Sequence, residues 1–158
     1  MKSKTLIKTS RFPVSEQYIF HKLKSIQTLQ YISSPYATFT PINKSDDLVW
    51  KAGETFSFRF KLFGVIPFGI RTIKVIGFNE ETYQIYTNEN NTYVPIWNHR
   101  ILLKSLGDNG SQYTDEVEIY AGWKTPFVYL WAKSFYTHRQ KKWLKLLNNS
   151  IMRNSELL

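Results

Sequence analysis

Residues 125–149 read TPFVYLWAKSFYTHRQKKWLKLLNN, and this stretch decides the fold because nothing after Pro126 interrupts a helix. Thr125 is a suitable N-cap, and Pro126 would take the first helical position, where its missing N–H costs nothing. Basic residues crowd the second half, where they complement the negative end of the helix dipole. The stretch therefore predicts one long helix that covers the core built by the rest of the chain.

One face of this predicted helix is apolar but contains an arginine. At about 100° per residue, the apolar arc consists of Val128, Trp131, Ala132, Phe135, Trp143 and Leu146. The opposite side carries Lys133, Thr137, Gln140 and Lys141. Arg139 falls inside the apolar arc, and His138 falls at its edge. Two interpretations of Arg139 stay open: its stem packs while its head reaches water, or its cation points into a cavity.

The composition fits one domain with a large aromatic content. A chain of 158 residues is the size of an ordinary domain. We expect one domain over residues 1–158, with a core over 4–149 and a frayed tail over 150–158. The 11 Phe, 10 Tyr and 5 Trp suit a packed sheet or the wall of an apolar pocket. The absence of cysteine excludes disulfides, thiolate catalysis and cysteine-bound zinc.

The chain is basic, with a formal charge of +9. Such a charge favours anionic partners, but the basic residues are scattered before the last helix, which favours an ordinary basic surface over a nucleic-acid partner. The N-terminus MKSKTLIKTSRF lacks the apolar region of a signal peptide. No apolar run approaches the roughly 20 residues that span a bilayer. We therefore expect a cytoplasmic protein without an integral membrane segment.

The rest of the sequence predicts a strand, two short helices and a run of strands. Residues 4–12 form the first strand, Ser15 caps the first helix, and the second helix ends at Ser33-Ser34-Pro35. Beyond these helices, apolar residues recur at every second position, as in strands with one buried face. The predicted strands are 37–41, 56–62, 71–77, 83–87, 97–103 and 115–121, and 46–50 either continues the first of these or forms a short strand.

The connections between these strands contain turn residues. Residues 107–110, Gly-Asp-Asn-Gly, are a hairpin turn, and the polar run 88–91 is expected to be another hairpin tip. Residues 63–69 form an apolar loop that either folds inward or acts as a gate. The order of elements predicts an α+β domain, in which a strongly bent antiparallel sheet of about seven strands wraps around the long C-terminal helix, with two short helices after strand one.

This order, together with several motifs, resembles the START-like or SRPBCC superfamily, which has the helix-grip fold of polyketide-cyclase-like and lipid-transfer proteins. The resemblance covers most of residues 4–149. It is carried by SRFPVSEQYIFHKL at 10–23, KAGETFSF at 51–58, IWNHRILL at 96–103, SQYTDEVEI at 111–119 and FYTHRQKKWLKLL at 135–147. The last motifs are most similar to the branch called cell-division-inhibitor-like, through Trp97 with His99, Thr114-Asp115 and Phe135 with His138-Arg139.

The resemblance implies an apolar cavity between the sheet and the final helix, and the binding of a lipid, polyketide or aromatic metabolite without a cofactor. An aromatic stripe alone would indicate plain core, but a sheet this bent is not filled by one helix. The residues expected to contact the ligand are Phe56, Phe58, Phe60, Ile73, Trp97, His99, Asp115, Val117, Trp131, Phe135, His138 and Arg139.

Three ionisable residues of this set form the sharpest candidate for chemistry. His99 shares a strand face with Trp97, Asp115 shares one with Val117, and Arg139 lies on the helix opposite. A buried Asp115 needs a partner, and either His99 or Arg139 would supply one. The group then acts as a structural ion pair, as a polar hook for a ligand's carboxylate or hydroxyl, or as a general acid/base pair built on His99. The chain's three histidines have no metal-binding spacing.

Three functions follow from these patterns. The first is non-enzymatic binding of an apolar or amphipathic molecule in the cavity. The second is a cyclase or dehydratase type of enzyme that uses His99 and Asp115. The third is docking of the basic helix, through Trp143, Leu146 and Leu147, on an anionic membrane or nucleic acid. The pattern favours the first, because no aromatic-and-basic recognition motif accompanies the charge.

Overall fold

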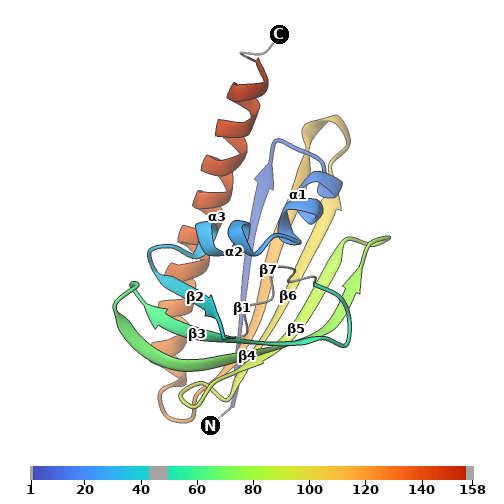
Figure 1. Ribbon diagram of the computed structural model, residues 1–158. Coiled ribbons are helices and arrows are strands. Elements are labelled where there is room, and N and C mark those ends of the chain that lie inside the picture. The colour runs from blue at the N-terminus through green and yellow to red at the C-terminus, as the bar shows by residue number, and fades with distance from the viewer. Residues whose placement is uncertain (1, 43–49, 156–158) are drawn as a thin grey trace.

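A computed structural model describes residues 2–42 and 50–155 of the chain (Figure 1). The predicted order of a strand, two short helices, further strands and one long helix is confirmed. The elements are β1 Lys4–Phe12, α1 Glu16–Leu23, α2 Ile26–Ser33, β2 Ala37–Pro41, β3 Thr55–Leu62, β4 Ile66–Asn79, β5 Gln84–Asn90, β6 Ile96–Ser105, a 3₁₀ turn Gly107–Asn109, β7 Ser111–Tyr120 and α3 Thr125–Ser155. The predicted strand at 46–50 lies, except for Trp50, outside the described residues, and Trp50 itself is not in a strand.

The described strands form one antiparallel sheet of seven, in the order β1-β7-β6-β5-β4-β3-β2. The pairing register shifts between Arg59 and Lys61 in β3 and between Val75 and Gly77 in β4. Such irregularities bend a sheet locally. Figure 1 shows the bent sheet with α3 running along one side of it and with α1 and α2 on that same side, so the α+β helix-grip architecture is confirmed.

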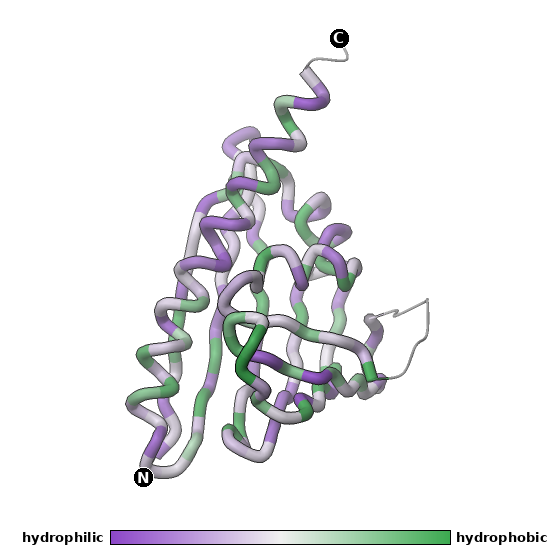
Figure 2. Tube along the Cα trace, turned by 60° about the vertical axis from the view of Figure 1, so that its left-hand side comes forward, coloured by the Kyte–Doolittle hydropathy of each residue, from purple (hydrophilic) through white to green (hydrophobic). Residues whose placement is uncertain are grey.

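The buried face of the sheet is the one that the alternating sequence predicts. Along β6 and β7 the side chains alternate strictly between buried and half-buried, and Trp97, His99, Asp115 and Val117 all point inward. Figure 2 shows that hydrophobic residues gather in the N-terminal half of α3 and hydrophilic ones in its C-terminal half. The N-terminal half of α3 thus supplies most of the apolar cover for the sheet.

The C-terminal half of α3 nevertheless contributes its largest side chain to the core. Trp143 is fully buried, with its ring 6.0 Å from the rings of both Phe12 and Tyr113. Leu147 is buried beside it, and Leu146 is half-buried. Two of the three residues expected to dock on a membrane or nucleic acid therefore face the protein's own sheet, and that surface is not available for docking. Within the described ranges, no helix is long and apolar enough to cross a membrane.

The structure corrects both ends of the predicted long helix. Thr125 lies in the helix rather than before it, and its Oγ1 accepts from Ala121 N at 2.9 Å and donates to Gly122 O at 2.7 Å. At the other end, the predicted frayed tail is helical through Ser155. No glycine or proline follows residue 149 up to that point, and Ser150 Oγ donates to Leu146 O, so nothing in the sequence stops the helix earlier.

Two further sequence-based expectations are wrong in detail. The apolar loop predicted at 63–69 is a tight turn followed by the start of β4, because Phe63 and Gly64 at positive φ reverse the chain at once. Gln140, placed on the outer face of the helix, is buried. Its Nε2 donates to Lys8 O at 2.8 Å and to Asp115 Oδ2 at 3.0 Å, which joins α3 to β1 and β7.

Candidate functional site

A cavity lies between the concave face of the sheet and the helices α2 and α3. Its volume is about 80 Å³, measured as the space open to the centre of a water molecule, so it is narrow. Its wall is mainly apolar and aromatic, and six of its lining residues are polar or charged. The lining residues are Leu23, Ile26, Leu29, Ser33, Phe39, Trp50, Phe58, Phe60, Arg71, Ile73, Phe78, Ile85, Thr87, Glu89, His99, Ile101, Trp131, Phe135, Tyr136 and Arg139.

Seven of the twelve residues expected to contact a ligand line this cavity: Phe58, Phe60, Ile73, His99, Trp131, Phe135 and Arg139. They come from β3, β4, β6 and α3, the elements that the predicted faces brought together. The ring of Trp131 stacks on that of Phe135, with centroids 5.0 Å apart and planes 9° from parallel. This pair forms an apolar part of the wall on α3.

The other five expected residues lie outside the cavity wall. Asp115 and Val117 are fully buried behind it, and the Trp97 indole N–H donates a hydrogen bond to the Tyr136 hydroxyl. Phe56 packs against Trp50, with ring centroids 4.9 Å apart. The remaining residue, His138, donates from Nε2 to the Ser34 carbonyl oxygen at 2.7 Å and so ties α3 to the end of α2.

Sequence reasoning missed the strongest ion pair on the wall. Glu89, expected at a polar hairpin tip, is buried on β5 and accepts from Arg71 Nε at 2.7 Å and Nη2 at 2.6 Å. Thr87 Oγ1 donates to the same carboxylate at 2.8 Å. Burial alone would raise the pKa of the Glu89 carboxyl, but the Arg71 charge, the neighbouring His99 and the hydrogen bonds from Thr87 and Arg71 together hold that pKa below its usual value.

A signal for this pair was present in the alternation. Ile85, Thr87 and Glu89 occupy every second position of β5, and Arg71 and Ile73 do the same on β4. Continuing the period-two count into the polar run would have placed Glu89 and Arg71 on the buried face. A buried arginine needs a carboxylate partner, and a glutamate on a neighbouring strand could have been assigned to it.

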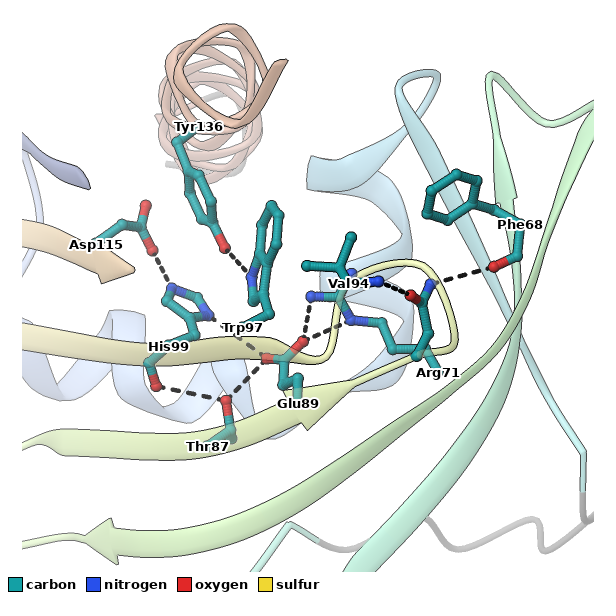
Figure 3. Close-up of polar contacts among 10 residues, drawn as sticks. Phe68, Arg71, Thr87, Glu89, Val94, Trp97, His99, Asp115 and Tyr136 are labelled. Carbon is teal, nitrogen blue, oxygen red and sulfur yellow. Dashed lines mark hydrogen bonds and ion pairs between the residues drawn. The ribbon is translucent and has the colours of Figure 1, made fainter. Parts of the chain in front are cut away.

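His99 sits between two carboxylates (Figure 3). Its Nε2 donates to Asp115 Oδ1 at 2.8 Å, and its Nδ1 lies 3.9 Å from Glu89 Oε1. Of the two partners foreseen for Asp115, His99 is therefore the one in direct contact. The line Arg71–Glu89–His99–Asp115 crosses the neighbouring strands β4, β5, β6 and β7.

The Asp115 carboxylate is also saturated by neutral donors. Tyr113 donates its hydroxyl proton to Oδ1 at 3.1 Å, and Gln140 Nε2 donates to Oδ2 at 3.0 Å. Burial alone would raise the pKa of the Asp115 carboxyl, but the nearby Arg139 charge and the His99 hydrogen bond hold it below its usual value. Asp115 is thus a buried anion at neutral pH.

Arg139 is the one predicted polar residue whose environment is incomplete. Its side chain is 6% exposed and lines the cavity, which excludes the interpretation in which its head reaches water. Its Nε has no hydrogen-bond partner among residues 2–42 and 50–155, and no salt bridge in those ranges involves Arg139. Burial alone would lower the pKa of the Arg139 guanidinium, but the nearby Tyr113 hydroxyl and Asp115 carboxylate hold it above its usual value, so the side chain stays charged.

Comparisons with known proteins support the fold and go no further. No family model and no curated protein matches the sequence. A START superfamily protein from Mycobacterium smegmatis superposes with a TM-score of 0.70 at 14% identity, covering 92% of this chain and 97% of that one. Protein MLL2253 from Mesorhizobium loti gives 0.71 at 12% identity, covering 92% and 98%.

A plant protein shares the same architecture. The major latex-like protein 151 of Panax ginseng superposes with a TM-score of 0.67 at 10% identity, over 93% of this chain and 99% of that one. Identities this low establish the fold alone, and the likeness to the cell-division-inhibitor-like branch stays a prediction. Together with the seven-stranded sheet and the long helix, these matches show that the chain has the START-like helix-grip fold.

Proposed function

We propose that this protein binds an apolar or amphipathic small molecule, of the lipid, polyketide or aromatic metabolite class, without transforming it. The observation that carries the proposal is the narrow cavity between sheet and α3, whose wall is mainly apolar and aromatic and includes a few polar or charged side chains. Ligand sites in proteins have this construction: apolar walls supply affinity, and a few placed polar groups fix orientation. The fold shared with START superfamily and major latex-like proteins agrees with this proposal.

The cavity favours a slender ligand over a bulky one. Burial of apolar surface contributes on the order of 25 cal/mol per Å², so a ligand that buries about 300 Å² gains on the order of 7 kcal/mol before the cost of immobilisation. Binding at 1 μM requires about 8 kcal/mol, so apolar burial supplies only part of the affinity and polar contacts to the ligand must add to it. Rigid aromatic walls such as Trp131 and Phe135 supply this contact with little loss of side-chain freedom.

The experiment that tests the proposal compares an obstructed cavity with an intact one. Ile73 lines the cavity, whereas Ile7 on β1 is 62% exposed. Delipidated protein should bind the neutral fluorescent probe N-phenyl-1-naphthylamine. Ile73→Trp should abolish that binding, and Ile7→Trp should leave it intact, with circular dichroism confirming both folds. Native mass spectrometry of gently purified wild-type protein should show a small-molecule adduct.

The result that contradicts the proposal is equally definite. A clean apo mass, with no probe binding and no thermal shift across a panel of lipids and aromatic metabolites, would show that the cavity holds no guest. Probe binding that Ile73→Trp and Ile7→Trp leave equally unchanged would place the binding elsewhere on the protein.

A second candidate, a cyclase or dehydratase type of enzyme, is favoured by the hydrogen bond between His99 and Asp115. A histidine that lines a cavity and is oriented by a buried carboxylate has the arrangement of a general base. The other ring nitrogen of His99, however, lies 3.9 Å from Glu89 rather than against open space. His99→Asn should leave ligand affinity within about twofold and abolish any turnover of the bound compound. Unaltered recovery of the ligand from the wild-type protein would exclude this function.

A further inference from the structure

The feature that the proposed function leaves unexplained is the buried, incompletely bonded guanidinium of Arg139. A buried charge that lacks hydrogen-bond partners is strongly unfavourable in a protein interior. Arg139 is 94% buried (6% exposed), lines the cavity, and has an Nε without a partner in the described ranges. The described side chains do not complete its bonding, and the cavity beside it is where a group that does so can bind.

The carboxylates around the cavity are already occupied. Glu89 accepts from Arg71 and Thr87. Asp115, buried behind the wall, accepts from His99, Tyr113 and Gln140. Neither carboxylate forms a salt bridge with Arg139. The Tyr113 hydroxyl and Asp115 therefore balance the charge of Arg139, and its Nε is left without a partner in the described ranges.

A second free donor lies one turn earlier on α3. The Tyr136 hydroxyl accepts from Trp97 Nε1 at 3.2 Å, and no described residue accepts the hydroxyl proton in return. Burial raises the pKa of the Tyr136 hydroxyl, so this proton stays in place at neutral pH. The Arg139 guanidinium carbon lies 5.6 Å from the centre of the Tyr136 ring, and both side chains line the cavity. Arg139 offers donors alone, and Tyr136 has a hydroxyl proton left to donate.

We propose that the ligand is an amphipathic monocarboxylic acid, with its carboxylate bound by Arg139 and Tyr136 and its apolar body held along the aromatic wall. This inference rests on the proposed function. A carboxylate only accepts hydrogen bonds, and its two oxygens match the planar fork of a guanidinium. A phosphate monoester carries roughly two negative charges near neutral pH, which a single unpaired arginine does not neutralise. An alcohol oxygen can accept from these donors but carries no charge to match the guanidinium, and an ammonium head brings only further donors and a like charge.

The test uses three ligands with one tail and different heads. Decanoic acid, decanol and decylamine each compete with N-phenyl-1-naphthylamine for delipidated wild-type protein near neutral pH. Decanoate should bind about tenfold more tightly than decanol. A hydrogen bond to a charged group is stronger than a neutral one, and the difference in free energy corresponds to about a tenfold change in affinity. Decylamine should bind most weakly, because its ammonium would approach Arg139.

Three variants locate the effect. Arg139→Gln should weaken decanoate about tenfold and leave decanol within about twofold, and Arg139→Lys should fall between wild type and Arg139→Gln. The control is Arg100→Gln, since Arg100 on β6 is partly exposed and paired with Glu116, and it should change neither ligand. If both Arg139 variants fail to fold, Tyr136→Phe tests the other donor and should weaken decanoate several-fold with decanol unchanged.

The outcomes separate this inference from the function on which it rests. Equal affinity for decanoate and decanol, or equal loss of both in Arg139→Gln, would overturn the carboxylate site while leaving apolar binding intact. Tightest binding of decylamine would show that the site selects the opposite charge. No binding of the probe or of any ligand by the wild-type protein would reject the proposed function itself.

Discussion

Replacement of Asp115 by asparagine tests the buried polar group that joins the sheet to α3. The wild-type carboxylate accepts three hydrogen bonds, from His99 Nε2 and Tyr113 at Oδ1 and from Gln140 at Oδ2. An asparagine amide has the same shape but replaces one of these acceptors by a donor. In either orientation of the amide, at least one neighbouring donor then faces another donor, and Arg139 loses its nearest negative charge.

The expected cost follows from these contacts. A donor left facing a donor costs about 1–3 kcal/mol, and two hydrogen bonds that lose a charged acceptor each weaken by about 1 kcal/mol. The free energy of unfolding should therefore fall by about 3–5 kcal/mol, in the range measured when one partner of a buried charged pair is removed. For a domain of this size, that loss lowers the melting temperature by roughly 6–20 °C.

The assay is urea denaturation of wild type, Asp115→Asn and a control. Glu116 is the neighbour of Asp115 on β7 but points outward to Arg100, with their charged atoms 3.7 Å apart and partly exposed. Glu116→Gln should change the free energy of unfolding by no more than about 1 kcal/mol. If Asp115→Asn lowers the free energy of unfolding by less than about 1 kcal/mol, with an unchanged m-value, then the three hydrogen bonds to this carboxylate do not stabilise the fold as argued.

The pH dependence of the same difference gives an independent check. The folded-state pKa of Asp115 lies below the ordinary value of 3.8, so its ionised form stabilises the protein at pH values above that value. This contribution is lost as the pH falls from about 3.8 through the lower folded-state pKa. The gap between wild type and Asp115→Asn that is measured near pH 7 should shrink as the pH falls below about 4. A stability difference that widens on acidification would show that the folded-state pKa of Asp115 is not lowered.

Three further predictions concern stability, each measured by urea denaturation. Gly110→Ala should cost several kcal/mol or prevent folding, because its Cβ would lie 2.1 Å from a β1 backbone oxygen. Gly107→Ala in the same turn meets nothing within 4 Å and should cost about 1 kcal/mol for its positive φ. Equal losses of stability in the two variants would contradict this. Trp143→Ala should cost about 3–5 kcal/mol as a fully buried side chain, and Trp123→Ala, 70% exposed, should stay within about 0.5 kcal/mol; similar losses would mean that α3 packs in another rotation. Glu89→Ala should cost about 3–5 kcal/mol by leaving its arginine partner buried and unpaired; a loss under about 1 kcal/mol would show that the pair is solvated.

The sequence predicted those parts of the fold that follow from local periodicity. The strict alternation around Trp97, His99, Asp115 and Val117 placed all four on the buried face, and the structure confirms that face. The cap at Ser15, the bounds of β1 and the end of α2 are confirmed as well. These features depend on residues close in the chain, so their signal is present before any tertiary contact forms.

The misses depend on contacts between distant segments. Gln140 was placed outward by its angular position on the helix, but its partners are the Lys8 carbonyl on β1 and Asp115 on β7, which only the packed helix brings near. Glu89 was assigned to a turn because polar residues surround it, whereas the buried Arg71 on the next strand holds it in β5. A polar side chain is buried where a hydrogen-bond partner is present, and the position of that partner depends on the fold rather than on the local sequence pattern.

The buried polar line also explains how a cavity can persist beside a core. Arg71, Glu89, His99 and Asp115 fix four neighbouring strands relative to one another, and Gln140 carries the connection onto α3. Apolar side chains alone tolerate repacking that would close a small void. Displacing buried hydrogen-bonded groups from their partners, in contrast, strongly destabilises the folded protein. We expect this line to hold the sheet bent and α3 at a set distance. Arg139, outside the line, is then the group free to bind a guest.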